Sequence, residues 1–493
     1  MSLLRGGRLA PQPGEVAKYT ASVAYDVHIA DEVVKVNIAH VVMLAERGLI
    51  DKSRASIILG ALLSAKPGEL LDETLEDVHM NLERWVTEKV GAEAAGWMHL
   101  AKSRNDQVAA AIRMKLREKL IEAGLALIAL RRALLSQSRA HLYTVMPGYT
   151  HLQRAQPITL ALHLLAHHDA LARDTERLKE CYVRVNQSPM GAAALAGSSI
   201  PVDRRRVAEL LGFEGLVEDT VDAVSARDFL VEALAAASLV MNHVSRLCEE
   251  MVLWSSSEFG FVEIADEYSS TSSIMPQKKN PVVAEVARAR AYRVYGDLLA
   301  ALSMTARLPL SYNLDLQEVT PHLWDAYDIL ISTLRVVAGM VSTATFNPTK
   351  MEEALSDGYV NATELANMLV KKGLSFRQAH HAVGLLVRRL LEQGRTLTSL
   401  TPSELVEAVR EVSGKEVVVG AEELKLALNP RWTVEACQVE GGPSPSRVKV
   451  MIDERVKKAS LDEKYFTSLK SKLEEAYDKL MEAVKVIASS GGG

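Results

Sequence analysis

Cysteine, aromatic residues and long apolar runs are all scarce in this chain of 493 residues. Its three cysteines, Cys181, Cys248 and Cys437, are too few and too far apart to form a disulfide framework or a CxxC metal site. We therefore expect free thiols in a reducing compartment. Aromatic residues make up 5% and hydrophobic residues 48% of the chain. This balance favours helices rich in alanine, leucine and valine over β-sandwiches or barrels.

Clustered positive charge is also missing. The formal net charge is -5, and only Arg204 to Arg206 forms a short basic run. The chain therefore lacks the broad basic surface typical of nucleic-acid-binding proteins. Neither the N-terminal segment nor any later one holds an apolar run of about 18 residues, the length that a membrane helix needs. We expect a cytoplasmic protein without nucleic-acid or membrane partners.

Helical periodicity dominates the middle of the chain and predicts an all-α fold. A first apolar stripe has a residue at every fourth position: Val108, Ile112, Leu116 and Leu120. Similar stripes run from about 158 to 184 and from 225 to 254, and they are broad, as in helices buried on several sides. The segments 146–157, 186–202 and 258–281 between them are punctuated by Pro, Gly and Ser. Loops of this length between long helices are commonly functional.

Punctuation also divides the chain into three expected domains. We expect an N-terminal helical domain over 1–106, a central long-helix bundle over 107–360 and a small helical domain over 361–493. Apolar residues of the last segment share one helix face: Leu469, Leu473, Tyr477, Leu480 and Val484. The final residues, Ser489 to Gly493, are expected to be disordered.

The most informative segment runs from Tyr268 to Pro281 and reads YSSTSSIMPQKKNP. Its hydroxyl, ammonium and amide groups are too dense for a core helix or strand and predict an active-site loop. They suit the removal of a weakly acidic proton next to a carboxylate. The Lys278 ammonium and the Asn280 amide can stabilise the charge that develops on the carboxylate. Ser272 can accept the proton if nearby donors stabilise its oxyanion.

Two other segments suit anion binding and proton transfer. A Ser-Arg-Asn-Asp string from Ser103 opens a long helix and offers backbone donors and a guanidinium to a dicarboxylate. Thr150 and His151 lie on a segment restrained by prolines, and imidazole titrates near neutral pH. Glu285, on the helix expected to begin after Pro281, could orient that imidazole.

Segment 268–281 resembles the signature loop of the fumarase and aspartase superfamily, GSSxMPxKxNP, and its QKKNP ending is the form seen in argininosuccinate lyases. Five further segments match the argininosuccinate lyase pattern in the family's chain order. They are TASVAYD from Thr20, EDVHMNLER from Glu76, HLAKSRNDQV from His99, MPGYTHLQRAQP from Met146 and SYNLDLQE from Ser311. The resemblance runs from about Thr20 to about Arg447.

The resemblance implies a three-domain, mainly α-helical lyase whose central bundles associate in a homotetramer, with three subunits contributing to each site. It also implies reversible β-elimination of L-argininosuccinate to L-arginine and fumarate, in arginine biosynthesis, without metal or organic cofactor. The implied catalytic residues are Ser272, His151, Glu285, Lys278 and Asn280. The implied binding residues are Ser103, Arg104, Asn105 and Thr150 for the fumarate half, Ser22, Asp26, Tyr312 and Gln317 for the arginine half, and His79 as a further site residue. Which of Ser272 and His151 is the base stays open.

Simpler roles remain open for individual motifs. The SRND string alone is an ordinary helix N-cap, and His151 alone would commonly be structural. His163 and His167, four residues apart on a helix, could bind a metal, but the surrounding sequence offers no carboxylate partner such as that of HExxH. A place on the helix surface or in the core is favoured for both.

The chain departs from the family pattern at a few positions. Thr271 replaces the usual glycine of the signature loop, and Thr320 stands where many relatives have lysine. Leu100, Ala101 and Lys102 replace the Thr-Gly-Arg of the common form HTGRSRND. The alternatives are a sister lyase acting on adenylosuccinate, aspartate or fumarate and malate, and a non-catalytic relative like the lens crystallins. The SYNLDLQE and QKKNP strings argue against the first, and the intact catalytic residues against the second.

Overall fold

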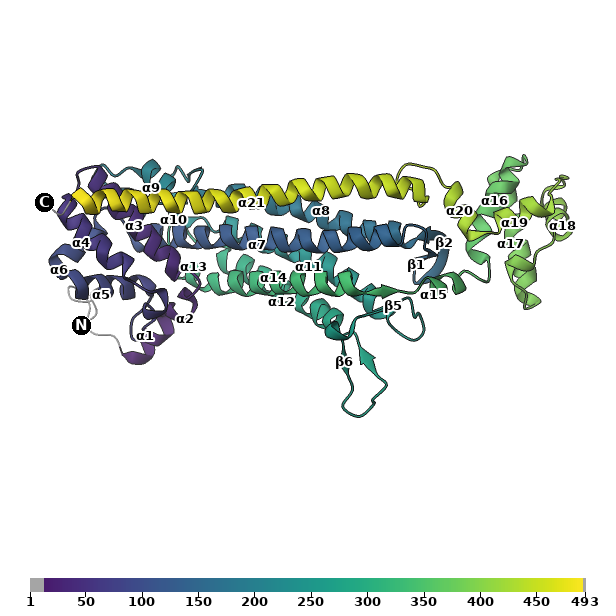
Figure 1. The fold of residues 1–493 in the computed structure, drawn as a ribbon, viewed down its shortest axis with the longest axis horizontal. Coiled ribbons are helices and arrows are strands. Elements are labelled where there is room, and N and C mark those ends of the chain that lie inside the picture. The colour runs from purple at the N-terminus through teal and green to yellow at the C-terminus, as the bar shows by residue number, and fades with distance from the viewer. Residues whose placement is uncertain (1–12, 491–493) are drawn as a thin grey trace.

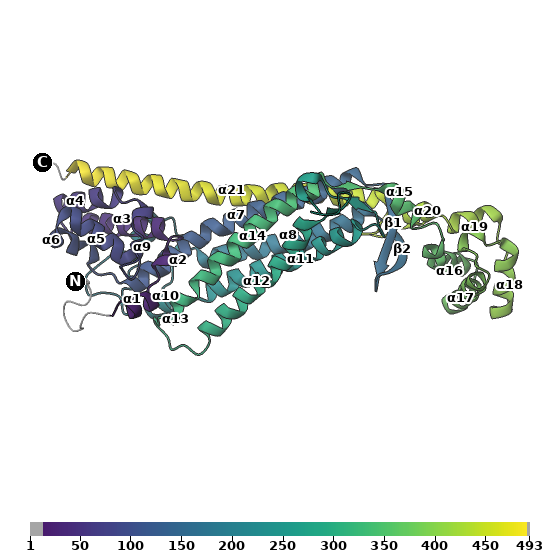
Figure 2. The same cartoon turned by 90° about the horizontal axis from the view of Figure 1, so that it is seen from below.

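The computed structural model describes residues 13–490 as an elongated, mainly helical molecule (Figures 1 and 2). Short helices from the start of the chain form one end, long helices form the middle, and a second group of short helices forms the other end. The predicted all-α class is confirmed.

The N-terminal helices pack around α3, which is buried along most of its length. Their bounds are α1 (Gly14–Thr20), α2 (Val23–Asp26), α3 (Ala30–Glu46), α4 (Lys52–Leu63), α5 (Val78–Val90) and α6 (Ala92–Gly96). Two aspartates start these helices: Asp51 caps α4 and Asp77 caps α5, each accepting a backbone N–H of the first turn. Asp77 also lines a cavity between these helices and the bundle.

The bundle consists of the long helices that the apolar stripes predicted, together with two more. They are α7 (Arg104–Ala140), α8 (Leu160–Val185), α11 (Asp228–Trp254), α12 (Val282–Thr305) and α14 (Thr320–Thr343). Ser103 and Asp106 form a capping box that starts α7. Within the described residues, one helical stretch, Asp315–Thr343, is apolar and long enough to cross a membrane by composition, but 61% of its apolar window is buried inside the protein. It packs as a core helix of the bundle.

A second small core forms at the far end of the molecule, around residues such as Leu369, Leu386 and Leu405. It is formed by α16 (Ala362–Lys371), α17 (Phe376–Glu392), α18 (Pro402–Ser413) and α19 (Ala421–Ala427). Two further short helices, α15 (Pro348–Glu353) and α20 (Pro430–Ala436), lie between this core and the bundle (Figure 1). The chain then returns along the whole bundle as α21 (Pro445–Ser490), the yellow helix of Figure 1. We propose that the chain is divided into the domains 1–106, 107–360 and 361–493, and that α21 of the third domain packs on the bundle of the second.

The expected disorder of the C-terminus is wrong for two of its residues, because Ser489 and Ser490 continue α21. Their hydroxyls donate hydrogen bonds to the carbonyl oxygen of Val486 one turn earlier. Residues 491–493 lie outside the described part of the chain, as do residues 1–12 at the N-terminus.

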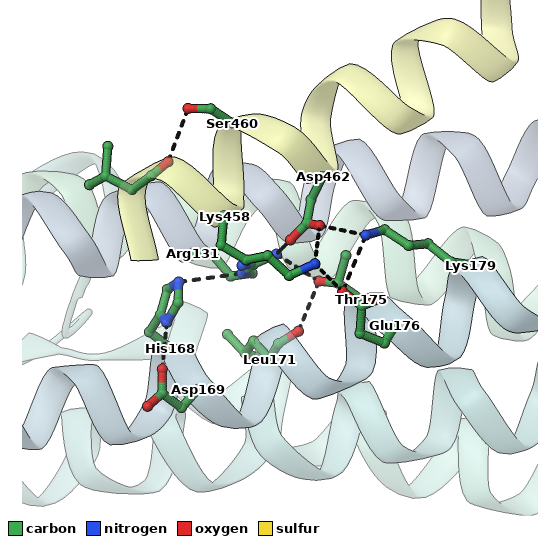
Figure 3. Close-up of polar contacts among 11 residues, drawn as sticks. Arg131, His168, Asp169, Leu171, Thr175, Glu176, Lys179, Lys458, Ser460 and Asp462 are labelled. Carbon is green, nitrogen blue, oxygen red and sulfur yellow. Dashed lines mark hydrogen bonds and ion pairs between the residues drawn. The ribbon is translucent and has the colours of Figure 1, made fainter. Parts of the chain in front are cut away.

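A buried polar cluster holds α21 against the bundle (Figure 3). Nη1 of Arg131 on α7 lies 2.7 Å from Oδ2 of Asp462 on α21, and both side chains are at most 1% exposed. Lys179 and Lys458 bind the other oxygen of Asp462 at 2.5 and 2.8 Å. Burial alone would raise the pKa of Asp462, but the hydrogen bonds from the two lysines and Arg131 lower it to about 2.

Short strands pair at four places. They are β1 (Val145–Thr150) with β2 (Gln153–Thr159), β3 (Gln187–Ser188) with β4 (Gly215–Leu216), β5 (Val262–Glu263) with β8 (Thr345–Phe346), and β6 (Ser270–Thr271) with β7 (Lys279–Asn280). Segment 146–157, expected to be a loop, is thus an antiparallel hairpin. The prolines argued against a strand because proline has no backbone N–H to donate. Pro147 lies opposite Pro157, however, so the two missing N–H groups belong to the same residue pair of the hairpin. The described residues also form the short helices α9 (Arg204–Leu210), α10 (Thr220–Ser225) and α13 (Asp315–Glu318).

Candidate active site

A cavity of about 130 Å³ lies where α2, α5, α13 and the start of α7 meet. It is lined by seven of the residues that we predicted to bind substrate: Ser22, Asp26, His79, Arg104, Asn105, Tyr312 and Gln317. These come from four separate sequence motifs. Ser103 lies directly before Arg104, as the N-cap of α7. The cavity therefore unites most of the predicted binding residues within one chain.

The carboxyl group of Asp26 is buried in this cavity and held by two donors. The Ser22 hydroxyl and the Val78 backbone N–H each donate a hydrogen bond of 2.9 Å to its Oδ2. Burial nevertheless dominates and raises the pKa of Asp26 to about 6, although both hydrogen bonds act in the opposite direction. Asp26 is thus ionised near neutral pH and becomes protonated in mild acid.

Arg104 forms the polar wall between the cavity and α5. Its Nη1 lies 2.7 Å from Oδ2 of Asp77 and 3.8 Å from Glu76. The amide of Asn105 donates to the carbonyl oxygen of Ala194 at 3.0 Å. Arg104 and Asn105 are therefore positioned by neighbours, and Ser103 is held by its place as the N-cap of α7.

Several buried donors around the cavity have no hydrogen-bond partner among the described residues. They are Nη2 of Arg104, Nε of Arg227 and the ring N–H of His79, whose second ring nitrogen, an acceptor, also has no partner. Burial lowers the pKa of His79 to about 4, so its imidazole is neutral at pH 7. Such unpaired buried groups are costly unless a ligand satisfies them. The cavity is thus prepared for a ligand with hydrogen-bond acceptors.

Arg227 and Asp77 line the cavity as well, but motif matching did not single them out. Arg227 is 3% exposed and is the residue before α11. A lone arginine before a helix carries no local signal of a site. For Asp77 a signal existed, because it lies inside the EDVHMNLER string that contains His79.

The signature segment forms a small hairpin, β6–β7, that projects from the bundle (Figure 1). Oγ of Ser272 accepts hydrogen bonds from the backbone N–H groups of Ile274 at 3.3 Å and Met275 at 3.1 Å. Donors of this kind are what a serine oxyanion requires. Lys278 is exposed, and the Asn280 amide donates to Ser270 at 3.4 Å. Thr271, in place of the usual glycine, pairs with Lys279 in the ladder.

His151 lies at the tip of the β1–β2 hairpin, next to Thr150. Both residues of its two-residue turn have positive φ, 55° for His151 and 57° for Leu152. This is the backbone of a type I′ turn, which normally selects glycine or asparagine. Non-glycine residues held there are strained, and such strain is typical of functional positions. The turn presents the His151 imidazole to solvent.

The predicted catalytic residues do not meet the cavity within one chain. Figures 1 and 2 place α2 and α13 at one end of the bundle and the β1–β2 hairpin at the other. Glu285 lies in the exposed first turn of α12. Among the described residues, no hydrogen bond or ion pair joins Glu285 to His151. One chain thus assembles the cavity but separates it from Ser272 and His151.

The departures from the family pattern also have structural consequences. Ala101, where relatives have glycine, keeps a positive φ of 59°. The Lys102 ammonium binds Asn37 and Gln107, and burial lowers its pKa to about 7. Thr320 lines the cavity at the place of the usual lysine, so no cation stands there.

Comparisons with known proteins agree with this architecture. A family model described as Lyase matches residues 7–296. EDDS lyase in complex with formate superposes with a TM-score of 0.88 at 31% identity, covering 98% of this chain and 97% of that one. A fumarate lyase from Mesorhizobium shares the fold, with a TM-score of 0.73 at 20% identity, covering 90% of this chain and 100% of that one. Fold and signature loop together define a lyase of the fumarase and aspartase superfamily.

The C-terminal part and the whole-chain relatives narrow this class. A family model described as Argininosuccinate lyase C-terminal matches residues 359–435. Argininosuccinate lyases of Methanothrix thermoacetophila and Methanosarcina acetivorans are 46% and 42% identical, and each match covers 98% of both chains. The chain belongs to the argininosuccinate lyase family, as the six motifs predicted.

Proposed function

We propose that this chain catalyses the reversible elimination of L-arginine from L-argininosuccinate to give fumarate, without metal or organic cofactor in the reaction. The cavity carries this assignment. It offers a buried carboxylate, Asp26, beside unpaired donors of His79 and Arg227. A zwitterionic α-amino acid end, with one ammonium and one carboxylate, fits that combination. Tyr312 and Gln317 line the same wall.

The chemical step uses the signature hairpin. Ser272 removes a proton from the carbon adjacent to the one that carries the leaving nitrogen. The two backbone N–H groups that donate to its Oγ stabilise the serine oxyanion that acts as the base. Lys278 and Asn280 stabilise the resulting aci-carboxylate. The carbon–nitrogen bond then breaks, and the electron pair of the proton-bearing carbon forms the fumarate double bond. His151, oriented by Glu285, protonates the leaving guanidinium nitrogen or activates Ser272. Ser103, Arg104, Asn105 and Thr150 hold the fumarate half.

The site is proposed to be composite, formed by three subunits of a homotetramer. The separation of cavity, Ser272 and His151 along one chain supports this assembly. So does α12, where large apolar side chains on one face of the helix remain exposed: Tyr292 by 69%, Leu299 by 66% and Leu302 by 48%. An unpaired apolar face on a long bundle helix suits association with further copies.

Mixed oligomers test the composite site directly. We expect Ser272→Ala and His151→Gln each to be inactive as pure proteins. Co-expressed with different tags and purified as mixed oligomers, they should regain up to about a quarter of wild-type activity. Some sites then combine the intact Ser272 of a His151→Gln subunit with the intact His151 of a Ser272→Ala subunit. If the mixed oligomers stay inactive, Ser272 and His151 of each active site come from the same subunit. Sedimentation of the wild type should give four chains.

The substrate is tested by the ultraviolet absorbance of fumarate. Purified protein is mixed with argininosuccinate and, in parallel, with adenylosuccinate, malate, aspartate and the EDDS lyase substrate. Fumarate from argininosuccinate alone supports the assignment. Activity on another compound alone would replace it with a sister lyase, and silence on all would favour a non-catalytic relative.

A cytoplasmic location completes the proposal. Cys181, Cys248 and Cys437 are free thiols, and the first two are buried. Burial raises the pKa of Cys181 and of Cys248 to about 12, so neither thiol is reactive at neutral pH. Such cysteines suit a reducing compartment.

A further inference from the structure

Two histidines and a glutamate meet between α8 and α11, in a part of the bundle that the reaction does not use. His163 and His167 lie one turn apart on α8, and their Nε2 atoms lie 2.6 and 2.8 Å from Oε2 of Glu250 on α11. One ligand atom from each residue lies within 4.8 Å of the others. Glu250 supplies the carboxylate that the local sequence did not offer, because it is 83 residues from His167 along the chain.

The three side chains form a recognised donor set. Two imidazole nitrogens and one carboxylate oxygen, with a fourth position for water, are typical of protein sites for zinc and similar divalent ions. In a tetrahedral site with bonds of about 2.0–2.1 Å, ligand atoms lie about 3.3 Å apart. The Glu250 carboxylate would therefore move back by less than about 1 Å, and the two imidazoles would approach each other by up to about 1.5 Å. Its side chain is 33% exposed and has room to do so.

The cluster is both held and accessible. The His163 ring packs against Trp254, with ring centroids 5.0 Å apart. The side chains of His163 and His167 are 25% and 14% exposed, so an ion can enter from solvent and keep a water ligand. A neighbouring contact shows the ordinary alternative. His243 on α11 binds Asp174 on α8 at 2.6 Å, and Asp174 also pairs with Arg177 at 2.8 Å. No third metal-ligating side chain joins them among the described residues.

We propose that His163, His167 and Glu250 bind one divalent transition-metal ion, Zn²⁺ being the type that suits these donors. The ion would join α8 to α11 where two catalytic segments begin. α8 starts directly after β2 of the His151 hairpin, and Glu250 lies one turn before the end of α11, from which the chain leads to the signature hairpin. The ion would thus hold both segments at their bases and take no part in the elimination.

The test is zinc binding by the metal-stripped, full-length oligomer, measured by calorimetric titration with ZnCl₂. We expect one tight site per chain. Glu250→Gln should weaken it by at least about 100-fold, more than the loss of a residue that only supports a ligand. Because the His243→Gln variant removes a comparable histidine between the same helices, it should bind zinc like the wild type. Cobalt(II) should give the intense visible bands of a four-coordinate ion in the wild type and in His243→Gln only.

Two outcomes would overturn the proposal. One is the absence of saturable binding at one ion per chain in the wild type. The other is equal affinity of the wild type and Glu250→Gln, which would assign the zinc to other surface histidines. Circular dichroism checks that Glu250→Gln is folded. If it is not, His167→Gln, which leaves the His163–Glu250 contact in place, is titrated instead and must show the same loss.

Discussion

The cavity and the two hairpins that carry Ser272 and His151 differ in almost every physical respect. In the cavity, Asp26 and His79 are each 8% exposed. In the hairpins, Ile274, two residues after Ser272, is 82% exposed, and Leu152, directly after His151, is 74% exposed. The cavity is completed by packing within one chain, whereas the hairpins present their reactive groups outward. Substitutions in the interior should therefore alter stability, and substitutions in the hairpins should alter activity alone.

Ser272→Ala should give the largest effect and is the sharpest test of this contrast. Removing a general base lowers kcat by roughly 10²- to 10⁴-fold. The free energy of unfolding should stay unchanged, because the side chain lies on a projecting hairpin. Both are measured on the same preparation, by fumarate absorbance and by urea unfolding. Ser273→Ala, one residue on and exposed, should be near normal in both. Near-normal turnover of Ser272→Ala would remove this residue from the mechanism.

Asp462→Ala should show the opposite behaviour, with a large loss of stability. It leaves the Arg131 guanidinium buried without its carboxylate, which typically costs about 3–5 kcal/mol. Glu463→Ala is the control, because Glu463 pairs with Arg132 between the same two helices at the surface. It should cost less than about 1 kcal/mol. Equal losses in the two variants would show that burial does not govern this contact.

The same aspartate predicts how stability depends on pH. Because the pKa of Asp462 is lowered to about 2 in the folded protein, its contribution is complete above the unfolded pKa of about 4 and is lost as the pH falls toward 2. Urea unfolding of the wild type should show this loss. In Asp462→Ala the corresponding part of the acid dependence should be absent.

Asp26→Asn tests whether the cavity contributes charge to substrate binding. Since the pKa of Asp26 is raised to about 6, protonation below that pH removes the carboxylate that we expect to bind the substrate ammonium. The wild-type kcat/KM should therefore fall as the pH drops through about 6. Asp26→Asn should lack this limb and lose about 10- to 100-fold in kcat/KM at neutral pH, as for a hydrogen bond to a charged group. Asp72→Asn, outside the cavity, should keep the limb.

The same contrast explains what could be predicted from sequence. Helices α7, α8 and α11 were predictable because apolar periodicity is local, and Ser272, Lys278 and Asn280 because their density in one loop is unusual. The seven motif residues at the cavity were named from the family resemblance, but that resemblance did not predict that a single chain would join them. Periodicity could not predict partners brought together by long-range packing, such as Arg227 at the cavity or Glu250 beside His163. The β1–β2 hairpin was missed because prolines and a register shift hide its strand pattern.

Ala101→Gly should give the smallest effect, and its sign is the test. Ala101 has a φ of 59°, a conformation that costs an alanine about 1–2 kcal/mol and glycine little. Part of this gain is offset by the greater freedom of glycine in the unfolded chain, so we expect a net stabilisation of up to about 1 kcal/mol. Ala129→Gly, at an exposed position inside α7, should destabilise by about 1 kcal/mol for the opposite reason. The two urea midpoints should therefore move in opposite directions. A lower midpoint for Ala101→Gly would mean that the methyl group of Ala101 contributes packing that outweighs the strain.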